Sequence, residues 1–131
     1  MATASLAGTA NESLGFAQAR QQRVLLGFAG FELDPARFEL RRAGTRIPLA
    51  PQPFDLLWLL ASRRGALVGR DEIRGALWGG ETFVEFDGCV NFCVRELRKA
   101  LGDDARRPRF ILAVRGRGYR FVAPVEVVPA A

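Results

Sequence analysis

The sequence contains no histidine and only two cysteines among its 131 residues. A disulfide framework needs several cysteine pairs, and the commonest zinc sites combine cysteine with histidine, so neither is expected. No stretch of about 18 apolar residues occurs, which argues against a membrane span within these residues. The first 23 residues have neither the basic start nor the continuous apolar run of a signal peptide. We therefore expect a cytoplasmic protein that needs no metal and no cofactor.

Sequence signatures of catalysis are also scarce. No glycine-rich phosphate loop followed by Lys-Ser or Lys-Thr is present, and no serine or cysteine has an evident general base. Asp55 lies in a predicted helix, and Asp103-Asp104 lie at a predicted helix end, so they form no acid–base pair. Cys89 and Cys93 stand four residues apart without a further soft ligand, so we interpret them as small packing residues. The sequence predicts that the protein is not an enzyme.

The positive charge is concentrated in one segment of the chain. The whole chain has 19 Lys and Arg against 14 Asp and Glu, a formal net charge of +5. Residues 95–120 alone hold nine of the bases and three of the acids, a net charge of +6. A concentration of this kind is typical of a surface that faces a polyanion. The alternative is a basic surface that is merely solvated.

The N-terminal third divides into a leader and a predicted sheet. Residues 1–23 are rich in Ala, Ser, Gly and Gln, which predicts a flexible N-terminal leader. From Val24 to Leu49, short segments with β-branched or aromatic residues alternate with turns that contain glycine or proline. This pattern predicts a four-stranded antiparallel sheet.

Three helices follow. PQPFDLLWLLASRRG, at residues 51–65, repeats apolar residues at i, i+3, i+4 and i+7, with proline in the first turn and glycine at the end. A second helix is predicted at about 70–78, with Ile73, Ala76 and Leu77 facing inward. The third, CVNFCVRELRKAL at residues 89–101, is amphipathic and ends at a glycine.

A basic hairpin closes the predicted domain. RFILAVRGRGYRFVAP, at residues 109–124, predicts two strands joined around Gly116-Arg117-Gly118, and residues 125–131 are interpreted as a C-terminal tail. A helix about 10–12 Å wide fits the major groove of duplex DNA. Arginines on a narrow hairpin reach flanking phosphates or the minor groove. The order of sheet, three helices and basic hairpin therefore predicts DNA binding.

Phe92 is an anomaly on the third helix. The predicted buried stripe consists of Val90, Val94, Leu97 and Leu101. At about 100° per residue, Phe92 falls almost opposite that stripe, among charged side chains. Three interpretations stay open: contact with thymine C5-methyl groups, contact with a neighbouring protomer or RNA polymerase, or a rotated helix that tucks Phe92 under Phe83 and Phe86.

Residues 24–124 resemble a known family. The most specific pieces are VRELRKALGDD, at the end of the third helix, and VRGRGYRF, in the hairpin. Both resemble the OmpR/PhoB-type winged-helix domain, the C-terminal DNA-binding module of bacterial response regulators in phosphorelay signal transduction. The resemblance implies an α+β winged helix-turn-helix in which the third helix enters the major groove and the hairpin, or wing, contacts the minor groove. Only 23 residues precede the module, so we expect it to act without a receiver domain.

The resemblance also implies residue roles. For the third helix and wing, the implied DNA-contacting residues are Asn91, Phe92, Arg95, Glu96, Arg98, Lys99, Arg115, Arg117 and Tyr119. The loop that faces RNA polymerase in the family corresponds to Glu81, Thr82, Phe83 and Glu85, although a plain connecting loop is an equal alternative. The expected partners are double-stranded DNA, RNA polymerase and a second copy bound head-to-tail on direct repeats. Localisation on the bacterial nucleoid is expected.

The sequence departs from the family pattern at several positions. Glu96 replaces a common arginine, and Gly88 replaces a common basic or polar residue, so the reading face carries less positive charge. Ala50 and Gly69 replace the usual Thr or Ser caps of the first two helices. The alternative function is a winged-helix protein-interaction module that contacts a partner through Phe92 and the wing.

Overall fold

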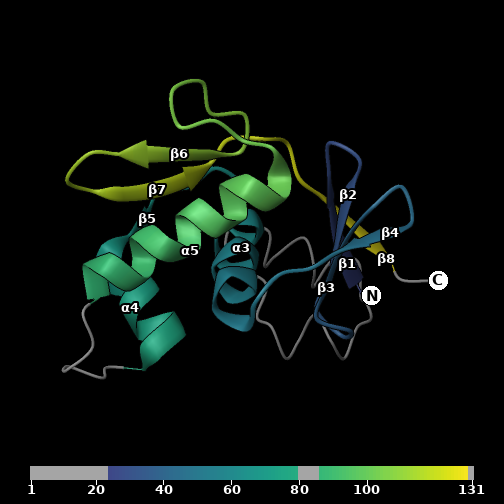
Figure 1. The fold of residues 1–131 in the computed structure, drawn as a ribbon, viewed down its shortest axis with the longest axis horizontal. Helices are drawn as coiled ribbons and strands as arrows, with labels where there is room; N and C mark the ends of the chain where they lie inside the picture. Colours follow the sequence, from purple (N-terminus) through teal and green to yellow (C-terminus); the bar gives the residue numbers. More distant parts are fainter. Residues whose placement is uncertain (1–23, 80–85, 130–131) are drawn as a thin grey trace, which may run out of the picture.

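The computed structural model describes residues 24–79 and 86–129, and the predicted leader lies outside them (Figure 1). The strands of one sheet are β1 (Val24–Phe28), β2 (Phe31–Asp34), β3 (Glu39–Arg42), β4 (Thr45–Ile47) and β8 (Glu126–Pro129). The helices are α3 (Pro51–Ser62), α4 (Arg70–Trp78) and α5 (Phe86–Leu101). The strands of the second sheet are β5 (Val68–Gly69), β6 (Ile111–Val114) and β7 (Gly118–Phe121). This order confirms the predicted winged-helix arrangement of sheet, three helices and hairpin.

The first sheet has five strands, in the order β4-β3-β2-β1-β8, and not the four that the sequence predicted. The prediction of residues 125–131 as a tail is wrong for residues 126–129. These residues pair antiparallel with β1, from Val24 opposite Pro129 to Gly27 opposite Glu126. The added strand satisfies backbone groups that β1 would otherwise leave unpaired at the edge of the sheet.

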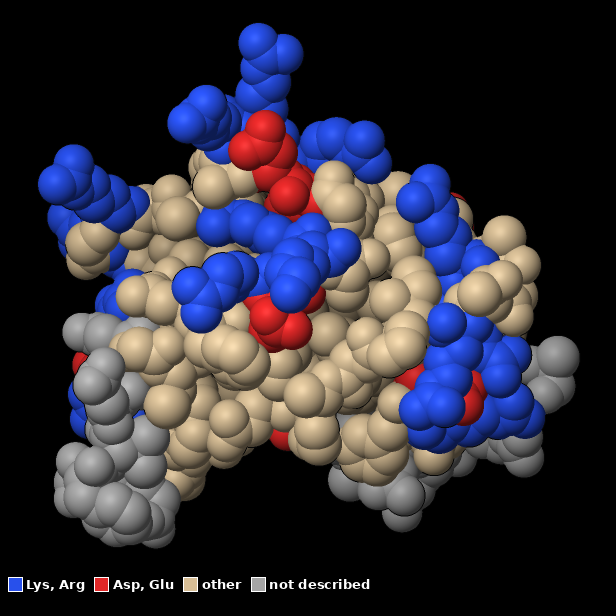
Figure 2. Space-filling model, in the orientation of Figure 1, with Lys and Arg blue, Asp and Glu red and all other residues tan. Residues whose placement is uncertain are grey.

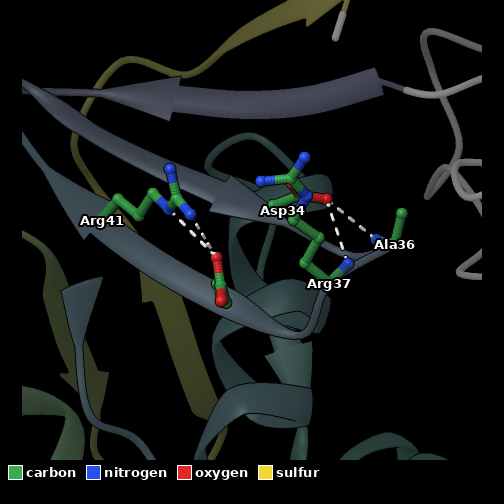
Figure 3. A network of polar contacts seen from close by, with 5 residues as sticks. Asp34, Ala36, Arg37 and Arg41 are labelled. Atoms are coloured by element: carbon green, nitrogen blue, oxygen red, sulfur yellow. Dashed lines mark hydrogen bonds and ion pairs between the residues drawn. The ribbon is translucent and has the colours of Figure 1, made fainter. Parts of the chain in front are cut away.

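The turn between β2 and β3 is held by side chains (Figure 3). The carboxylate of Asp34 accepts hydrogen bonds from the backbone N–H groups of Ala36, at 3.0 Å, and Arg37, at 3.3 Å. On β3, the guanidinium of Arg41 lies 2.8 Å from the Glu39 carboxylate. Arg41 therefore stands beside an acid of the same strand.

The α3 helix forms the centre of the helical layer. Residues 56–62 of α3 are all buried, which agrees with the predicted burial on most sides, and the helix packs against both α4 and α5. In α4 only Ile73 is buried, and Leu77 is half-buried against the core. Ala76 is exposed, so its predicted inward orientation is wrong. No helix within the described ranges is long and apolar enough to cross a membrane.

An aromatic cluster joins the two sheets. The Phe28 ring lies edge-on to Phe121, with centroids 4.9 Å apart, and to Phe110, at 5.8 Å. Phe31 makes a further edge contact with Phe110 at 5.6 Å. Edge-to-face contacts at these distances are favourable beyond the area that they bury. The cluster therefore fixes the base of the hairpin relative to the N-terminal sheet.

The wing hairpin, β6 and β7, belongs to a three-stranded sheet in the order β5-β7-β6, because the short strand β5 pairs with β7. Gly118 lies where β7 crosses β5, with φ +148. A Cβ atom at this position would overlap the carbonyl oxygen of Val68. Only glycine allows this close backbone approach, which anchors the wing to the segment that leads into α4.

Candidate nucleic-acid interface

The α5 helix and the wing lie side by side on one face of the molecule (Figure 1). Figure 2, in the same orientation, shows Lys and Arg side chains gathered over α5, the wing and the loop between α5 and β6. The basic segment of residues 95–120 spans these three features. The fold therefore brings the excess positive charge of the sequence to one face.

The orientation of α5 is as predicted. Val90, Val94, Leu97 and Leu101 are all at most 3% exposed and form part of the core. Asn91, Arg95 and Lys99 are exposed, and Phe92 is 48% exposed. The interpretation in which α5 is rotated to bury Phe92 is therefore wrong. The other two interpretations of Phe92 stay predictions.

Two contacts organise the outward face of α5. The Arg95 guanidinium carbon lies over the Phe92 ring, 5.9 Å from its centroid. The ammonium of Lys99 lies 3.6 Å from the Glu96 carboxylate, one turn earlier. The acid thus offsets one positive charge on the face, and the surface combines an apolar ring, a guanidinium and an ion pair.

Arg98 connects α5 to the wing. Its Nη2 atom donates a hydrogen bond to the carbonyl oxygen of Ile111 on β6, at 3.0 Å. Its Nε atom is buried and has no hydrogen-bond partner within the described part of the chain. The family resemblance implied a DNA contact for this side chain, and that role stays a prediction. The contact with β6 is a structural role that the sequence analysis missed.

Asp103 is the second connection between α5 and the wing. One carboxylate oxygen accepts a hydrogen bond from the N–H of Arg109, at 2.7 Å, and the other from the N–H of Ile111, at 2.9 Å. The N–H of Asp103 itself donates to the carbonyl of Arg98, at 2.8 Å, just after Gly102 turns with φ +69. The sequence indicated only a helix-end turn here, because spacing does not reveal which amide groups a carboxylate meets.

A groove of ≈ 470 Å³ separates α5 from the wing. Its lining residues are Asn91, Val94, Arg95, Arg98, Lys99, Asp103, Ala105, Ala113 and Tyr119. Five of them belong to the predicted DNA-contacting set. Tyr119 is only 6% exposed, so most of its ring packs into the core and little of it remains for a ligand.

The tip of the wing carries two exposed arginines. Arg115 and Arg117 flank Gly116, and the turn is closed by a hydrogen bond of 2.8 Å from the N–H of Arg117 to the carbonyl of Val114. Arg120, farther along β7, instead donates from Nε to the carbonyl of Gly65, at 2.9 Å. The wing therefore presents Arg115 and Arg117 outward, whereas Arg120 braces its base.

A smaller hollow lies against Phe92. It has a volume of ≈ 340 Å³ and is lined by Gln52, Gly88, Cys89 and Phe92. Gln52 belongs to the first turn of α3, where it is exposed. The sequence analysis did not select Gln52, since no local pattern indicates that the start of α3 lies beside the start of α5.

The cysteines of α5 have different environments. Cys93 is buried, and Cys89 is half-buried. Burial, together with the nearby charges of Cys89, Asp55 and Glu96, raises the pKa of the Cys93 thiol to about 11. No cluster of three or more potential metal ligands is found within residues 24–79 and 86–129. The predicted polymerase-facing residues Glu81, Thr82, Phe83 and Glu85 lie outside the described residues.

Known proteins with similar sequences are bacterial regulators. The transcriptional regulatory protein HprR of Escherichia coli is 36% identical over 113 residues, which cover 82% of this chain and 48% of HprR. The transcriptional activator protein IrlR of Burkholderia pseudomallei is 38% identical over 102 residues, 78% of this chain and 43% of IrlR. This chain spans about half the length of the curated relatives that it matches.

Two solved structures that resemble this chain are DNA-binding domains. The DNA-binding domain of RstA from Klebsiella pneumoniae, solved in complex with the RstA box, is 32% identical and aligns with a TM-score of 0.66 over 75% of this chain and 96% of that chain. The DNA-binding domain of E. coli CadC is 29% identical, with a TM-score of 0.67 over 80% and 97% of the two chains. Residues 44–121 match the family model described as "Transcriptional regulatory protein, C terminal". The chain belongs to this family, the OmpR/PhoB-type winged-helix domains that the sequence resembles.

Proposed function

We propose that this chain binds double-stranded DNA in a sequence-specific manner, with α5 in the major groove and the wing at the minor groove. The observation that carries the proposal is that the exposed side of α5 and the arginine-tipped wing share one basic face. The RstA domain of the same fold was solved in complex with its DNA box, which supports the same ligand here.

The residues of this face divide by chemistry into two roles. Arg115 and Arg117 on the wing, and Lys99 on α5, supply cations for phosphates, which fix position without reading sequence. Asn91, Phe92 and Glu96 supply an amide, an apolar ring and a carboxylate acceptor for base edges in the major groove. A reading face with one acid and one apolar ring favours discrimination between sequences over non-specific electrostatic attraction.

A second basic region is less suited to DNA. In the β2–β3 turn, Arg37 lies 3.9 Å from the carboxylate of Asp34, and on β3, Arg41 pairs with Glu39 (Figure 3). Positive charge that stands beside fixed negative charge attracts a polyanion less strongly. Lys99 on α5 is paired with Glu96 in the same way, so the contrast rests on the exposed arginines of the wing tip, Arg115 and Arg117, and supports the wing side of the molecule as the DNA-binding face.

The protein partners that we propose rest on the family alone. They are RNA polymerase and a second copy bound head-to-tail on direct repeats, and DNA binding of this kind would place the protein on the nucleoid. The alternative function, a protein-interaction module that uses Phe92 and the wing, predicts weak dependence of affinity on salt.

The test is selection from random duplexes followed by titration of the selected site at several salt concentrations. We expect the logarithm of the binding constant to fall linearly with the logarithm of salt concentration. Arg117→Ala should weaken binding to all sequences and reduce that slope by about 1. Arg37→Ala removes the same charge from the β2–β3 turn and serves as the matched control, with the slope unchanged. No selected consensus, or a flat salt dependence, would contradict the proposal.

A further inference from the structure

Phe92 is a large apolar ring that the fold leaves uncovered on the candidate reading face. It is 48% exposed, and its polar neighbours Asn91 and Arg95 are also exposed. Leaving such a ring in water is unfavourable, so a ligand that covers it gains free energy from its burial. The guanidinium of Arg95 over the ring restricts the directions in which Phe92 can turn. The ring therefore has one partner on the helix itself, and nearly half of its surface remains open to a ligand.

The hollow beside the ring is suited to a small apolar group. Its walls come from two helices, because Gln52 lies at the start of α3, whereas Gly88 and Cys89 lie one turn before Phe92 on α5. Gly88 contributes no side chain, which leaves room, and the cysteine behaves as a small, weakly polar wall. Among the described residues, no charged side chain lines the hollow.

The major groove offers one apolar group of this kind. Guanine, cytosine and adenine present hydrogen-bond donors and acceptors there, whereas thymine also presents its C5-methyl group. We propose that Phe92 is a specificity-determining residue and that the hollow formed with Gln52, Gly88 and Cys89 receives the C5-methyl group of a thymine. This inference rests on the proposed function, since it requires α5 to lie in the major groove.

The experiment removes the methyl group from the DNA instead of changing the base pair. Each thymine of the selected site is replaced in turn by deoxyuridine, which keeps the Watson–Crick pairing and lacks only C5-methyl. We expect one position at which wild-type affinity falls by about fourfold, the factor that corresponds to burial of one methyl group. In Phe92→Ala, that same replacement should have no effect, because the partner of the methyl group is gone.

Two controls separate this contact from general effects. Arg117→Ala should weaken binding to the thymine and deoxyuridine duplexes equally, because its partner is a phosphate. Phe38→Ala removes a second phenylalanine that is about as exposed, at 47%, in the β2–β3 turn, and should leave the ratio of the two affinities unchanged. Thermal melting of each variant confirms that it is folded. Phe92→Ala should melt close to wild type, since its ring is not part of the core.

Each result of the deoxyuridine experiment leads to a different conclusion. A methyl dependence that is present in wild type and absent in Phe92→Ala supports the inference. Specific binding in which no thymine depends on its methyl group, or in which the dependence persists in Phe92→Ala, overturns the inference and leaves the proposed function standing. Absence of any sequence-specific DNA binding overturns both, and binding of a protein partner through Phe92 would then explain the exposed ring.

Discussion

At the scale of the residue, the carboxylate of Asp103 holds the wing at its angle to α5. It accepts hydrogen bonds from the N–H groups of Arg109 and Ile111. We expect Asp103→Ala to lower the free energy of unfolding by about 1–3 kcal/mol, because two donors lose their partner. Asp103→Asn keeps one acceptor oxygen and should lose less. Chemical denaturation of both variants measures the difference, and equal losses would contradict the assignment.

The buried thiol of Cys93 is expected to make the stability of the fold depend on pH. Its thiol is buried, which raises its pKa to about 11 from an ordinary value of 9.0. Below about pH 9 the thiol is protonated in both the folded and the unfolded state, and its contribution to the free energy of unfolding is fully present. Between about pH 9 and 11 the unfolded chain loses the proton first, so the free energy of unfolding falls as pH rises, by at most about 1.4 kcal/mol per pH unit.

The measurement is denaturation of wild type and of Cys93→Ala between pH 8 and 11. This range covers the fall in stability between the pKa of about 9 in the unfolded chain and the pKa of about 11 in the folded protein. The variant lacks the titrating group, although it also leaves a small cavity that lowers its stability at every pH. We therefore expect the stability advantage of wild type to narrow as pH rises through this window. A constant difference would show that the thiol titrates alike in both states.

Periodicity identified which residues of α5 are buried and which are exposed, because a 3.6-residue repeat fixes the faces of a helix. For Arg98, however, the sequence showed a basic residue and did not indicate its partner. The hydrogen bond from Arg98 to Ile111 joins residues 13 positions apart, and no local pattern encodes such a contact. The same holds for Gln52, which reaches the Phe92 hollow from another helix.

At the scale of the element, the start of α4 lacks a side-chain cap that a substitution can supply. Gly69 is its N-cap, with φ −74 and ψ 159 and no side-chain cap hydrogen bond. An added Cβ would lie 3.8 Å from the nearest heavy atom, so serine fits. We expect Gly69→Ser to raise the free energy of unfolding by about 0.5–1 kcal/mol, because its hydroxyl can accept from the N–H of Asp71 or Glu72 and the unfolded chain loses freedom.

Ala50→Ser at the start of α3 is the matched comparison. Ala50 has nearly the same backbone conformation and also lacks a side-chain cap hydrogen bond. However, Pro53 occupies the third helical position and has no N–H, so only the N–H of Gln52 remains for the hydroxyl. The hydroxyl therefore has two possible donors at Gly69 and one at Ala50. Thermal melting should show a gain for Gly69→Ser that is absent in Gly69→Ala, which reduces the freedom of the unfolded chain equally but has no hydroxyl. An equal gain for serine and alanine at position 69 would contradict the capping argument.

The sequence predicted the helices and the hairpin better than it predicted strand partners. Turn residues and apolar alternation mark where β1 to β4 begin and end, and glycines mark the wing turn. Strand β8 was missed because Glu126–Pro129 is short and its partner β1 lies about 100 residues earlier in the chain. Pairing at that separation depends on the assembled core and not on local sequence.

At the scale of the whole molecule, strand β8 completes the N-terminal sheet, whereas the proposed DNA-binding face lies on α5 and the wing. Leu26, at 0% exposure, pairs with Val127, which packs against the core, whereas Val128 pairs with Leu25, which is not part of the buried core. Removal of residues 126–131 should therefore uncover the edge of β1 and part of the core. The aromatic cluster and the Asp103 contacts, which position α5 and the wing, stay intact.

We expect the truncated chain to melt at a lower temperature than the full chain and to associate at high concentration through the exposed edge of β1. Below its melting temperature it should bind the selected duplex with nearly unchanged affinity, because its binding face is retained. Val127→Ser should reproduce much of the loss of stability, and Val128→Ser, at the next position of the same strand, should cost less, since only Val127 packs against the core. Calorimetry, light scattering and duplex titration measure the three properties separately. If truncation lowered DNA affinity as strongly as stability, the sheet and the binding face would be energetically coupled, contrary to the separation that the fold indicates.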